Sequence, residues 1–253
     1  MNPRFERSGP IEQLSSYPTW AQDMVADCEN NKQSVVGHEL FALMREARLD
    51  PESTANFMIG IWPVIERFPG YMAMNLLKTS FGRSAGDNLA RRWLVRNIRV
   101  EQNHAEYWLN WAEGEGVARA KVLDTKWASH ESDALAHWCE DVSRSGTLAA
   151  GIAATNYAIE GATGEWSQLV YDSPTYRNSL DTASLRWLHL HAAYDDTHPW
   201  EALEIVCTLL GTAPAAHEVK HISECVGRTY QTMAMTLDKC LVKRNLGRIE
   251  IAA

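Results

Sequence analysis

The chain contains 253 residues, 45% of them hydrophobic, and its 24 basic and 32 acidic residues give a formal net charge of −8 at pH 7. A single domain of this size buries about 75% of the surface of its unfolded chain, so a substantial apolar core is expected. Because the chain is acidic overall and lacks a Lys/Arg-rich segment, it has no concentration of positive charge to neutralise phosphates, and nucleic acid is excluded as an expected partner.

Nothing in the chain predicts a membrane segment. Residues 1–13 lack the apolar stretch of a secretory signal, and the longest strongly apolar stretch, residues 148–154, is far shorter than the ~20 residues that span a bilayer. We therefore expect a cytoplasmic protein without stable membrane insertion. The cysteines are odd in number, widely spaced and without a CxxC pair, which favours reduced thiols over disulfides or a thiolate zinc site; they are Cys28, Cys139, Cys207, Cys225 and Cys240.

Apolar residues recur with helical spacing along most of the chain. The pattern predicts amphipathic helices around residues 20–28 and 57–68, the second behind the start signal Asp50-Pro51-Glu52. A long helix is expected over 87–113, ending at a glycine pair, and further helices over about 132–143, 147–170, 182–210 and 215–242. No hairpin, repeat or linker interrupts this pattern. We therefore predict one all-α domain over residues 1–253, a bundle of about seven to nine helices.

The first candidate site is the ExxH motif Glu101-Gln102-Asn103-His104, inside the long predicted helix. Residues three apart on a helix lie about 60° apart around the axis and one turn apart along it, so both side chains can reach one ion. The simpler interpretation is a solvent-facing glutamate beside a hydrogen-bonded histidine. The many apolar neighbours of this helix make extensive exposure difficult and favour the metal site.

A second candidate lies in the segment HAAYDDTH, where His191, Asp195 and His198 form a narrow stripe on an ideal helix. The two histidines would stand about 10.5 Å apart along that helix, which is long for one compact site. Pro199 lacks an N–H and predicts a kink or break that could bring His198 inward. The alternative is that the proline starts a new helix capped by Thr197 or Asp196, with ordinary polar histidines.

A third candidate is Glu160, which follows an apolar segment rich in small residues. Burying a carboxylate there is costly unless a cation lies close, and a metal would supply that charge. The small residues Gly161, Ala162 and Gly164 also permit close helix packing, and the glutamate would then be exposed. Taken together, three carboxylates and three imidazoles from three predicted helices suit iron or manganese, and six ligands suggest a pair of irons; the predicted ligands, with metal-binding and catalytic roles, are Glu101, His104, Glu160, His191, Asp195 and His198.

The pattern ExxH, a lone Glu and HxxxDxxH resembles that of the heme-oxygenase-like diiron oxidases and oxygenases, and all six positions match. Residues 90–108, 151–167 and 191–205 are similar to the members that convert fatty acids to 1-undecene, as is the segment starting at Lys78. The resemblance covers most of the chain and implies the helical bundle of the heme oxygenase superfamily, without heme. It also implies two Fe(II) ions per chain, O₂ as co-substrate and an external reductant from an unidentified electron donor.

The reaction implied by this resemblance is O₂-dependent decarboxylation of a medium-chain fatty acid such as lauric acid, with loss of a β-hydrogen and release of a terminal alkene and CO₂. Two Fe²⁺, three carboxylates and three neutral imidazoles sum to +4 − 3 = +1, which would attract a carboxylate headgroup. An alkyl tail would gain about 0.8 kcal/mol per buried CH₂ in an apolar channel. The apolar residues near the motifs are either channel lining or ordinary core; they are Phe57, Ile159, Trp187, Leu190 and Tyr194.

Two other functions remain open at this point. The same diiron site could act on another substrate, as relatives that oxidise amino acids do. Alternatively, the chain could be a metal-free helical protein resembling the thiaminase-type members of the superfamily, in which a cysteine is the nucleophile. The cysteines lie in no motif of that group.

Overall fold

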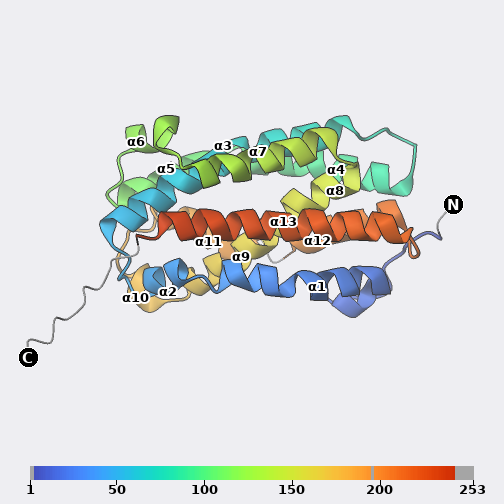
Figure 1. Cartoon of the computed structure of the whole chain (residues 1–253), viewed down its shortest axis with the longest axis horizontal. Helices are drawn as coiled ribbons and strands as arrows, with labels where there is room; N and C mark the ends of the chain where they lie inside the picture. Colours follow the sequence, from blue (N-terminus) through green and yellow to red (C-terminus); the bar gives the residue numbers. More distant parts are fainter. Residues whose placement is uncertain (1–2, 195–196, 243–253) are drawn as a thin grey trace, which may run out of the picture.

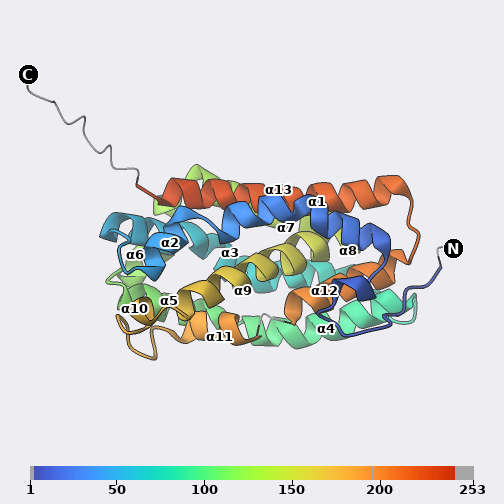
Figure 2. The same ribbon diagram turned by 90° about the horizontal axis from the view of Figure 1, so that it is seen from below.

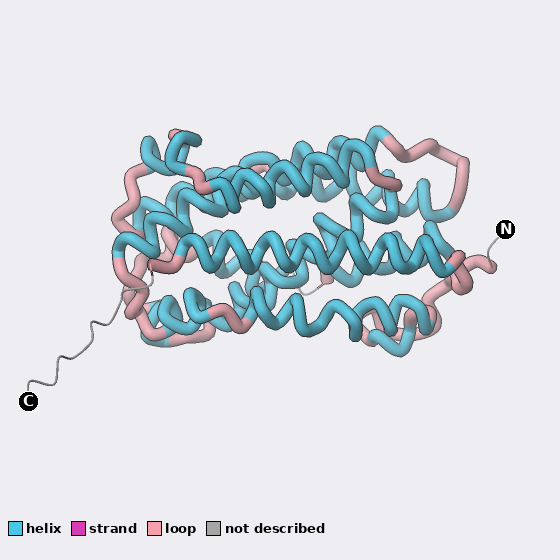
Figure 3. The backbone as a smooth tube through the Cα atoms, in the orientation of Figure 1, coloured by secondary structure: helices cyan, strands magenta, loops and turns pink. Residues whose placement is uncertain are grey.

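The computed structural model describes residues 3–194 and 197–242, and these segments consist of helices joined by turns and loops, without strands (Figure 3). The all-α prediction is confirmed. The longer helices are α1 (Thr19–Val36), α3 (Pro51–Leu77), α4 (Ala85–Glu101), α5 (His104–Gly114), α7 (His130–Ser145), α9 (Ala158–Tyr171), α11 (Arg186–Tyr194), α12 (His198–Leu210) and α13 (Ala216–Cys240). Shorter helices are α2 (Glu39–Arg45), α6 (Arg119–Leu123), α8 (Leu148–Ile152) and α10 (Pro174–Arg177), with the turns η1 (Leu14–Ser16), η2 (Thr125–Trp127) and η3 (Ala153–Tyr157).

The described segments contain more helices than the seven to nine expected, partly because three predicted helices are interrupted. The helix expected over 87–113 is divided into α4 and α5, and the one expected over 182–210 into α11 and α12. The helix expected over 147–170 contains the π-helical turn η3 between α8 and α9. Each interruption lies beside a predicted ligand, so the irregular backbone is concentrated at the candidate site.

Several helices begin or end at residues that cap them. The Asp50 side chain accepts hydrogen bonds from the backbone N–H groups of Glu52 and Ser53 at the start of α3, and Pro51 occupies the first helical position. The Ser129 side chain caps α7 in the same way. At its carboxyl end, α12 stops at Gly211, whose φ of 80° is a conformation that favours glycine.

The helices form an elongated bundle in which distant parts of the sequence lie side by side (Figure 1). The carboxyl-terminal helix α13 packs against α1 and α7, and α3 packs against α7 and α4. In the view from below, α9 crosses the middle of the bundle, with α1 and α13 on one side and α4 and α11 on the other (Figure 2). The residues that follow η3 are therefore central in the bundle.

Large aromatic side chains from several helices form the middle of the core. Four tryptophans contact one another, and three of them contact Phe57 of α3, with ring centroids 4.8 to 6.4 Å apart. They are Trp108 and Trp111 of α5, Trp166 of α9 and Trp187 of α11. Each of these rings is at most 3% exposed. This cluster fixes α5, α9 and α11 relative to one another, and these helices carry much of the candidate site.

All five cysteines are free thiols, and all are buried. Burial raises their pKa values, for example to about 11 for Cys28 and Cys225. Among the described residues, no helix combines the length and apolar character needed to cross a bilayer.

Candidate metal centre

The ExxH motif lies at the break between α4 and α5. Glu101 is the last residue of α4, His104 is the first of α5, and the prediction of one continuous helix was wrong at this point. The backbone N–H of Asn103 bonds the carbonyl of Val100, three residues earlier, in place of the four-residue spacing of an α-helix. Both motif side chains are buried, and Nδ1 of His104 lies 2.7 Å from Oε2 of Glu101.

Glu160 lies in the first turn of α9, directly after the π-helical turn, a kind of irregularity that often occurs at functional sites. Its side chain is 5% exposed, so it is not the exposed glutamate of the alternative interpretation. Nδ2 of the fully buried Asn156 donates to Oε1 of Glu160 at 2.6 Å. Burial raises the pKa of Glu160; the proximity of His198 opposes this shift, and the proximity of Glu101 adds to it.

His191 is buried in α11 and is held by the backbone of its own helix. Because a carbonyl oxygen only accepts, Nδ1 of His191 donates to the carbonyl of Trp187 at 2.7 Å, which places the ring proton on Nδ1 and the lone pair on Nε2. The indole of Trp187 stacks on the imidazole with centroids 3.8 Å apart. Burial, and then the neighbouring His104, lowers the pKa of His191 well below its usual range, so the ring is in its neutral, metal-binding form.

His198 is the first residue of α12, next to Pro199 in the first turn. The predicted break beside this proline is confirmed. A new helix begins there, but the Thr197 side chain makes no capping hydrogen bond, and Asp196 lies outside the described residues. His198 also approaches the other predicted ligands. Its Nδ1 lies 3.2 Å from Oε2 of Glu160. The predicted ligand Asp195 lies outside the described residues.

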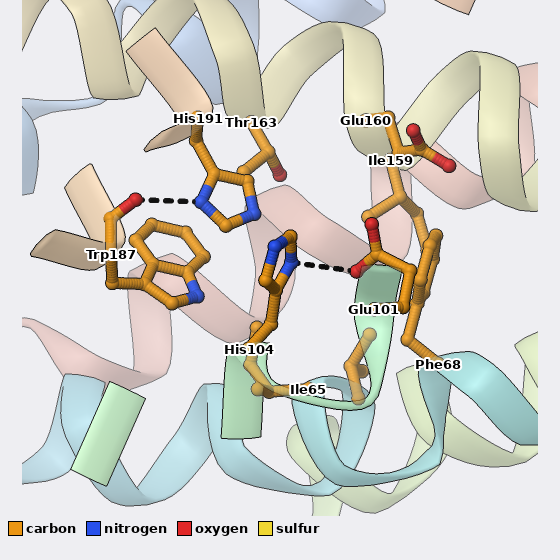
Figure 4. Close-up of a pocket in the computed structure, with 10 residues that line it drawn as sticks. Ile65, Phe68, Glu101, His104, Ile159, Glu160, Thr163, Trp187 and His191 are labelled. Carbon is orange, nitrogen blue, oxygen red and sulfur yellow. Dashed lines mark hydrogen bonds and ion pairs between the residues drawn. The ribbon is translucent and has the colours of Figure 1, made fainter. Parts of the chain in front are cut away.

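The structure thus brings five predicted ligands together. Three potential metal-binding atoms lie within 4.8 Å of one another; they are a carboxylate oxygen of Glu101, a carboxylate oxygen of Glu160 and a ring nitrogen of His198. The rings of His104 and His191 are 4.7 Å apart, and His104 lies between His191 and Glu101 (Figure 4).

These residues fit a bound metal. Glu101 and Glu160 are 6% and 5% exposed, and the described residues that line the cavity beside them include no lysine or arginine. Two carboxylates this close and this buried need a cation to offset their desolvation and mutual repulsion. Carboxylate oxygens combined with imidazole nitrogens form a donor set suited to iron or manganese.

Two adjoining cavities lie beside the ligands. The first is lined by Glu101, His104, Glu160 and His191 together with Thr163 and apolar residues. The second is lined by aliphatic side chains, Phe41 and Phe57, together with Thr163 and the indoles of Trp166 and Trp187. The cavities share the wall formed by Val64, Ile65, Ile159, Thr163 and Trp187. Of the residues suggested as channel lining, Ile159 and Trp187 face both cavities, Phe57 faces the second, Leu190 lines neither, and the side chain of Tyr194 is not described.

Two residues of the site were not predicted from the sequence. Asn156 lies four residues before Glu160, and that spacing was the available signal for a contact on one helix face. Thr163 lies at the junction of the cavities, three residues after Glu160. A threonine in a segment of small residues gives no signal that distinguishes cavity lining from packing.

Comparison with known proteins gives a family and a fold. A family model described as an iron-containing redox enzyme matches residues 55–232. A crystal structure described as a TenA homologue, from Pseudomonas syringae pv. tomato str. DC3000, is 48% identical, with a TM-score of 0.91 over 94% of this chain and 98% of that chain.

More distant structures share the fold alone. A TenA homologue from Pyrococcus furiosus is 14% identical, with a TM-score of 0.69 over 87% of this chain and 99% of that chain. A domain of unknown function with a heme oxygenase-like fold, from Shewanella denitrificans, is 13% identical, with a TM-score of 0.68 over 86% of this chain and 90% of that chain. No curated protein matches the sequence.

Proposed function

Because this chain belongs to the family of iron-containing redox enzymes, we propose that its buried Glu/His cluster binds iron and uses O₂ to oxidise a carboxylate substrate with an apolar tail. One observation carries this proposal: buried carboxylates and histidines converge beside a cavity that continues into an apolar one. We propose two irons per chain, held by the five ligands described above and Asp195. The electron donor is an external reductant.

The protein's own residues position the ligands. Asn156 orients the Glu160 carboxylate through its amide N–H, and the Trp187 carbonyl fixes the His191 tautomer. Bound iron would supply the one-electron chemistry and O₂ activation that amino acid side chains do not provide. The apolar walls exclude water from the reacting centre.

The substrate class follows from charge and cavity shape. With two Fe²⁺, three carboxylates and three neutral imidazoles, the centre would carry a net +1 and attract a monoanionic headgroup. The second cavity would receive an alkyl tail, at about 0.8 kcal/mol per buried CH₂. A medium-chain fatty acid satisfies both requirements, and the sequence resembles the 1-undecene-forming decarboxylase UndA. We therefore propose decarboxylation of such an acid to a terminal alkene and CO₂.

The direct test is a product assay. Protein loaded anaerobically with Fe(II) and then given O₂, lauric acid and a reductant is expected to release 1-undecene and CO₂. His104→Ala should abolish the product, whereas His137→Ala, which changes an exposed histidine on α7, should not. Protein that binds iron but makes no alkene from any medium-chain acid would refute decarboxylation and leave the iron site intact.

A cavity-filling variant tests the alkyl tail separately. Met233 lines the second cavity, whereas Met235, two residues later on α13, is 56% exposed. Met233→Trp should shift the preference toward shorter acids, since each CH₂ excluded from the cavity weakens binding by about 0.8 kcal/mol, roughly fourfold. Met235→Trp is the matched control. An unchanged chain-length profile in Met233→Trp would mean that the tail does not occupy this cavity.

The second candidate function is an enzyme of the same fold that acts on a substrate other than a fatty acid. The comparisons support this candidate better than fatty-acid decarboxylation. The 48% identical structure is described as a TenA homologue, and a structure from Sulfolobus solfataricus with the same fold is described as a putative TenA-like thiaminase. The substrate would then be an amino acid or, in a metal-free enzyme, a thiamine-like compound attacked by a cysteine. None of the five cysteines, all of which lie in described segments, lines the cavity beside the ligands.

Elemental analysis separates these candidates. Protein purified from iron-rich medium should contain iron that His104→Ala removes. An amino acid that accelerates O₂ consumption by the iron-loaded protein, with fatty acids inert, would favour the amino acid oxidase. Protein without iron that cleaves thiamine would favour the metal-free enzyme.

A further inference from the structure

A continuous series of oxidisable side chains leads away from the candidate metal centre. The Trp187 indole stacks on His191, with centroids 3.8 Å and planes 26° apart, and stacks on Trp111, with centroids 5.4 Å and planes 19° apart. Nε1–H of Trp111 donates to the Tyr176 oxygen at 2.8 Å. The Tyr176 hydroxyl in turn donates to a carboxylate oxygen of Glu115.

The exposure of these residues changes along the series. Trp187, Trp111 and Tyr176 are 1%, 0% and 3% exposed. Glu115 is only partly buried, and it follows the last residue of α5 between two exposed glycines. The series therefore begins at a predicted iron ligand and ends at the protein surface.

We propose that Trp187, Trp111, Tyr176 and Glu115 form a one-electron relay between the metal centre and an electron donor at the surface. The proposal goes beyond the substrate assigned above and needs only a redox-active metal ion at the ligands. Tryptophan and tyrosine are among the side chains that lose an electron most readily, and electron transfer rates fall steeply with distance. Short steps between such rings are therefore what a relay requires.

Electrons and protons balance along this path. Trp187 would give one electron to an oxidised metal ion held at the ligands, Trp111 would replace that electron, and Tyr176 would replace the electron lost by Trp111. The phenol proton of Tyr176 passes along its hydrogen bond to the Glu115 carboxylate. The net result is a reduced metal ion, a Tyr176 phenoxyl radical and a protonated Glu115. A one-electron reductant at the surface then restores Tyr176, and Glu115 returns the proton.

The hydrogen bond at the end of the relay suits this proton transfer. Burial raises the pKa of Tyr176 well above its usual range, so the phenol does not lose its proton to water before it is oxidised. Burial also raises the pKa of Glu115, which makes its carboxylate a better proton acceptor.

The other aromatic rings that contact Trp187 do not lead to a phenol that is hydrogen-bonded to a carboxylate. Trp166 stacks on Phe41, whose ring is hard to oxidise. Trp108 donates its indole N–H to the backbone carbonyl of Met58, and an amide carbonyl is too weak a base to take up a proton near neutral pH. Within the described part of the chain, the branch through Trp111 is the one that leads to a phenol bonded to a carboxylate.

The test is detection of the radical, which a purely structural role of these rings would not produce. Iron-loaded, reduced protein is exposed to O₂ without organic substrate, frozen at intervals and examined by electron paramagnetic resonance, with ring-deuterated tyrosine to assign the signal. Wild-type protein should show a tyrosyl radical. Tyr176→Phe, which keeps the ring, should lose it, and Glu115→Gln should slow its appearance.

Tyr230→Phe is the matched control, because Tyr230 is 1% exposed and has no ring contact with the tryptophans among the described residues. An unchanged tyrosyl signal in Tyr176→Phe, or no tyrosyl signal in wild-type protein whose iron is oxidised, would overturn the relay. If the protein binds no iron, the proposed function fails. The relay is then tested by photo-oxidation of the tryptophans in the metal-free protein. A flash-induced tyrosyl radical that depends on Tyr176 and Trp111 supports it, and equal signals in wild type and variants refute it.

Discussion

At the scale of the residue, Asn156 illustrates how the site depends on side chains that are not ligands. Its amide donates to Glu160 at 2.6 Å from within the π-helical turn. We expect Asn156→Ala to weaken iron binding about 10- to 100-fold, the usual effect of removing a group that orients a ligand. Iron affinity can be measured by competition with a chelator. Asn75→Ala, at an equally buried asparagine in α3 that does not line the cavity beside the ligands, is the control, and equal affinities in both variants would contradict this role.

Glu115 makes a separate prediction about pH. Since burial raises its pKa in the folded protein, the folded state holds a proton that the unfolded chain has already released. The stabilisation from this proton is complete below the usual glutamate pKa and is lost as pH rises through the raised one. The free energy of unfolding should therefore fall with increasing pH across that window, and Glu115→Gln should remove this part of the slope.

Urea unfolding at a series of pH values measures this effect as the difference between wild type and Glu115→Gln. Glu113→Gln, two residues earlier on α5 and exposed, controls for a general change of charge. A difference between Glu115→Gln and wild type that stays constant with pH would show that the carboxylate does not titrate in this way.

At the scale of the element, the start of α12 depends on a glycine in α9. A Cβ added to Gly161 would lie 3.3 Å from Cβ of Pro199, which is closer than ordinary van der Waals contact. Gly161→Ala should push the first turn of α12 away from α9 and separate His198 from Glu160. We expect weaker iron binding in a folded protein, measured by chelator competition together with circular dichroism.

Gly70→Ala is the matched control, because an added Cβ in α3 would meet nothing within 4 Å. Replacing a glycine inside a helix by alanine should raise the free energy of unfolding by about 0.5–1 kcal/mol there, without changing iron affinity. If Gly161→Ala binds iron as tightly as Gly70→Ala, the close contact between α9 and α12 does not position His198.

Most helices and most candidate ligands could be predicted from the sequence, because periodicity, caps and punctuation are local signals. The break before His198 was predictable for the same reason, since Pro199 cannot continue a helix. The break at Glu101 was not, because no glycine or proline marks it. The π-helical turn and the contact between Trp111 and Tyr176 likewise depend on tertiary packing, which a single sequence does not reveal.

At the scale of the whole molecule, the metal should act as a cross-link. Glu101, Glu160 and His198 belong to different helices, and the two carboxylates are buried in the folded chain. Iron at 100 times its dissociation constant should add about 2.7 kcal/mol to the free energy of unfolding. Thermal unfolding under anaerobic conditions, with and without Fe(II), measures this, and a chelator should reverse it.

A Glu101→Gln, His198→Gln double variant should unfold at the same temperature with and without Fe(II). A similar iron-dependent rise in this variant and in wild type would place the stabilising metal elsewhere in the protein.

The order of the ligands along the chain also determines when the centre can form. The described ligands lie at positions 101, 104, 160, 191 and 198, and the helix that carries the last of them packs against η3, α8 and α4. During synthesis, an amino-terminal fragment that ends before α12 has only part of the ligand set and lacks the packing that aligns it. We therefore expect iron to bind late in folding, after α12 has packed, and a fragment that ends before α12 to bind iron more weakly than the full chain.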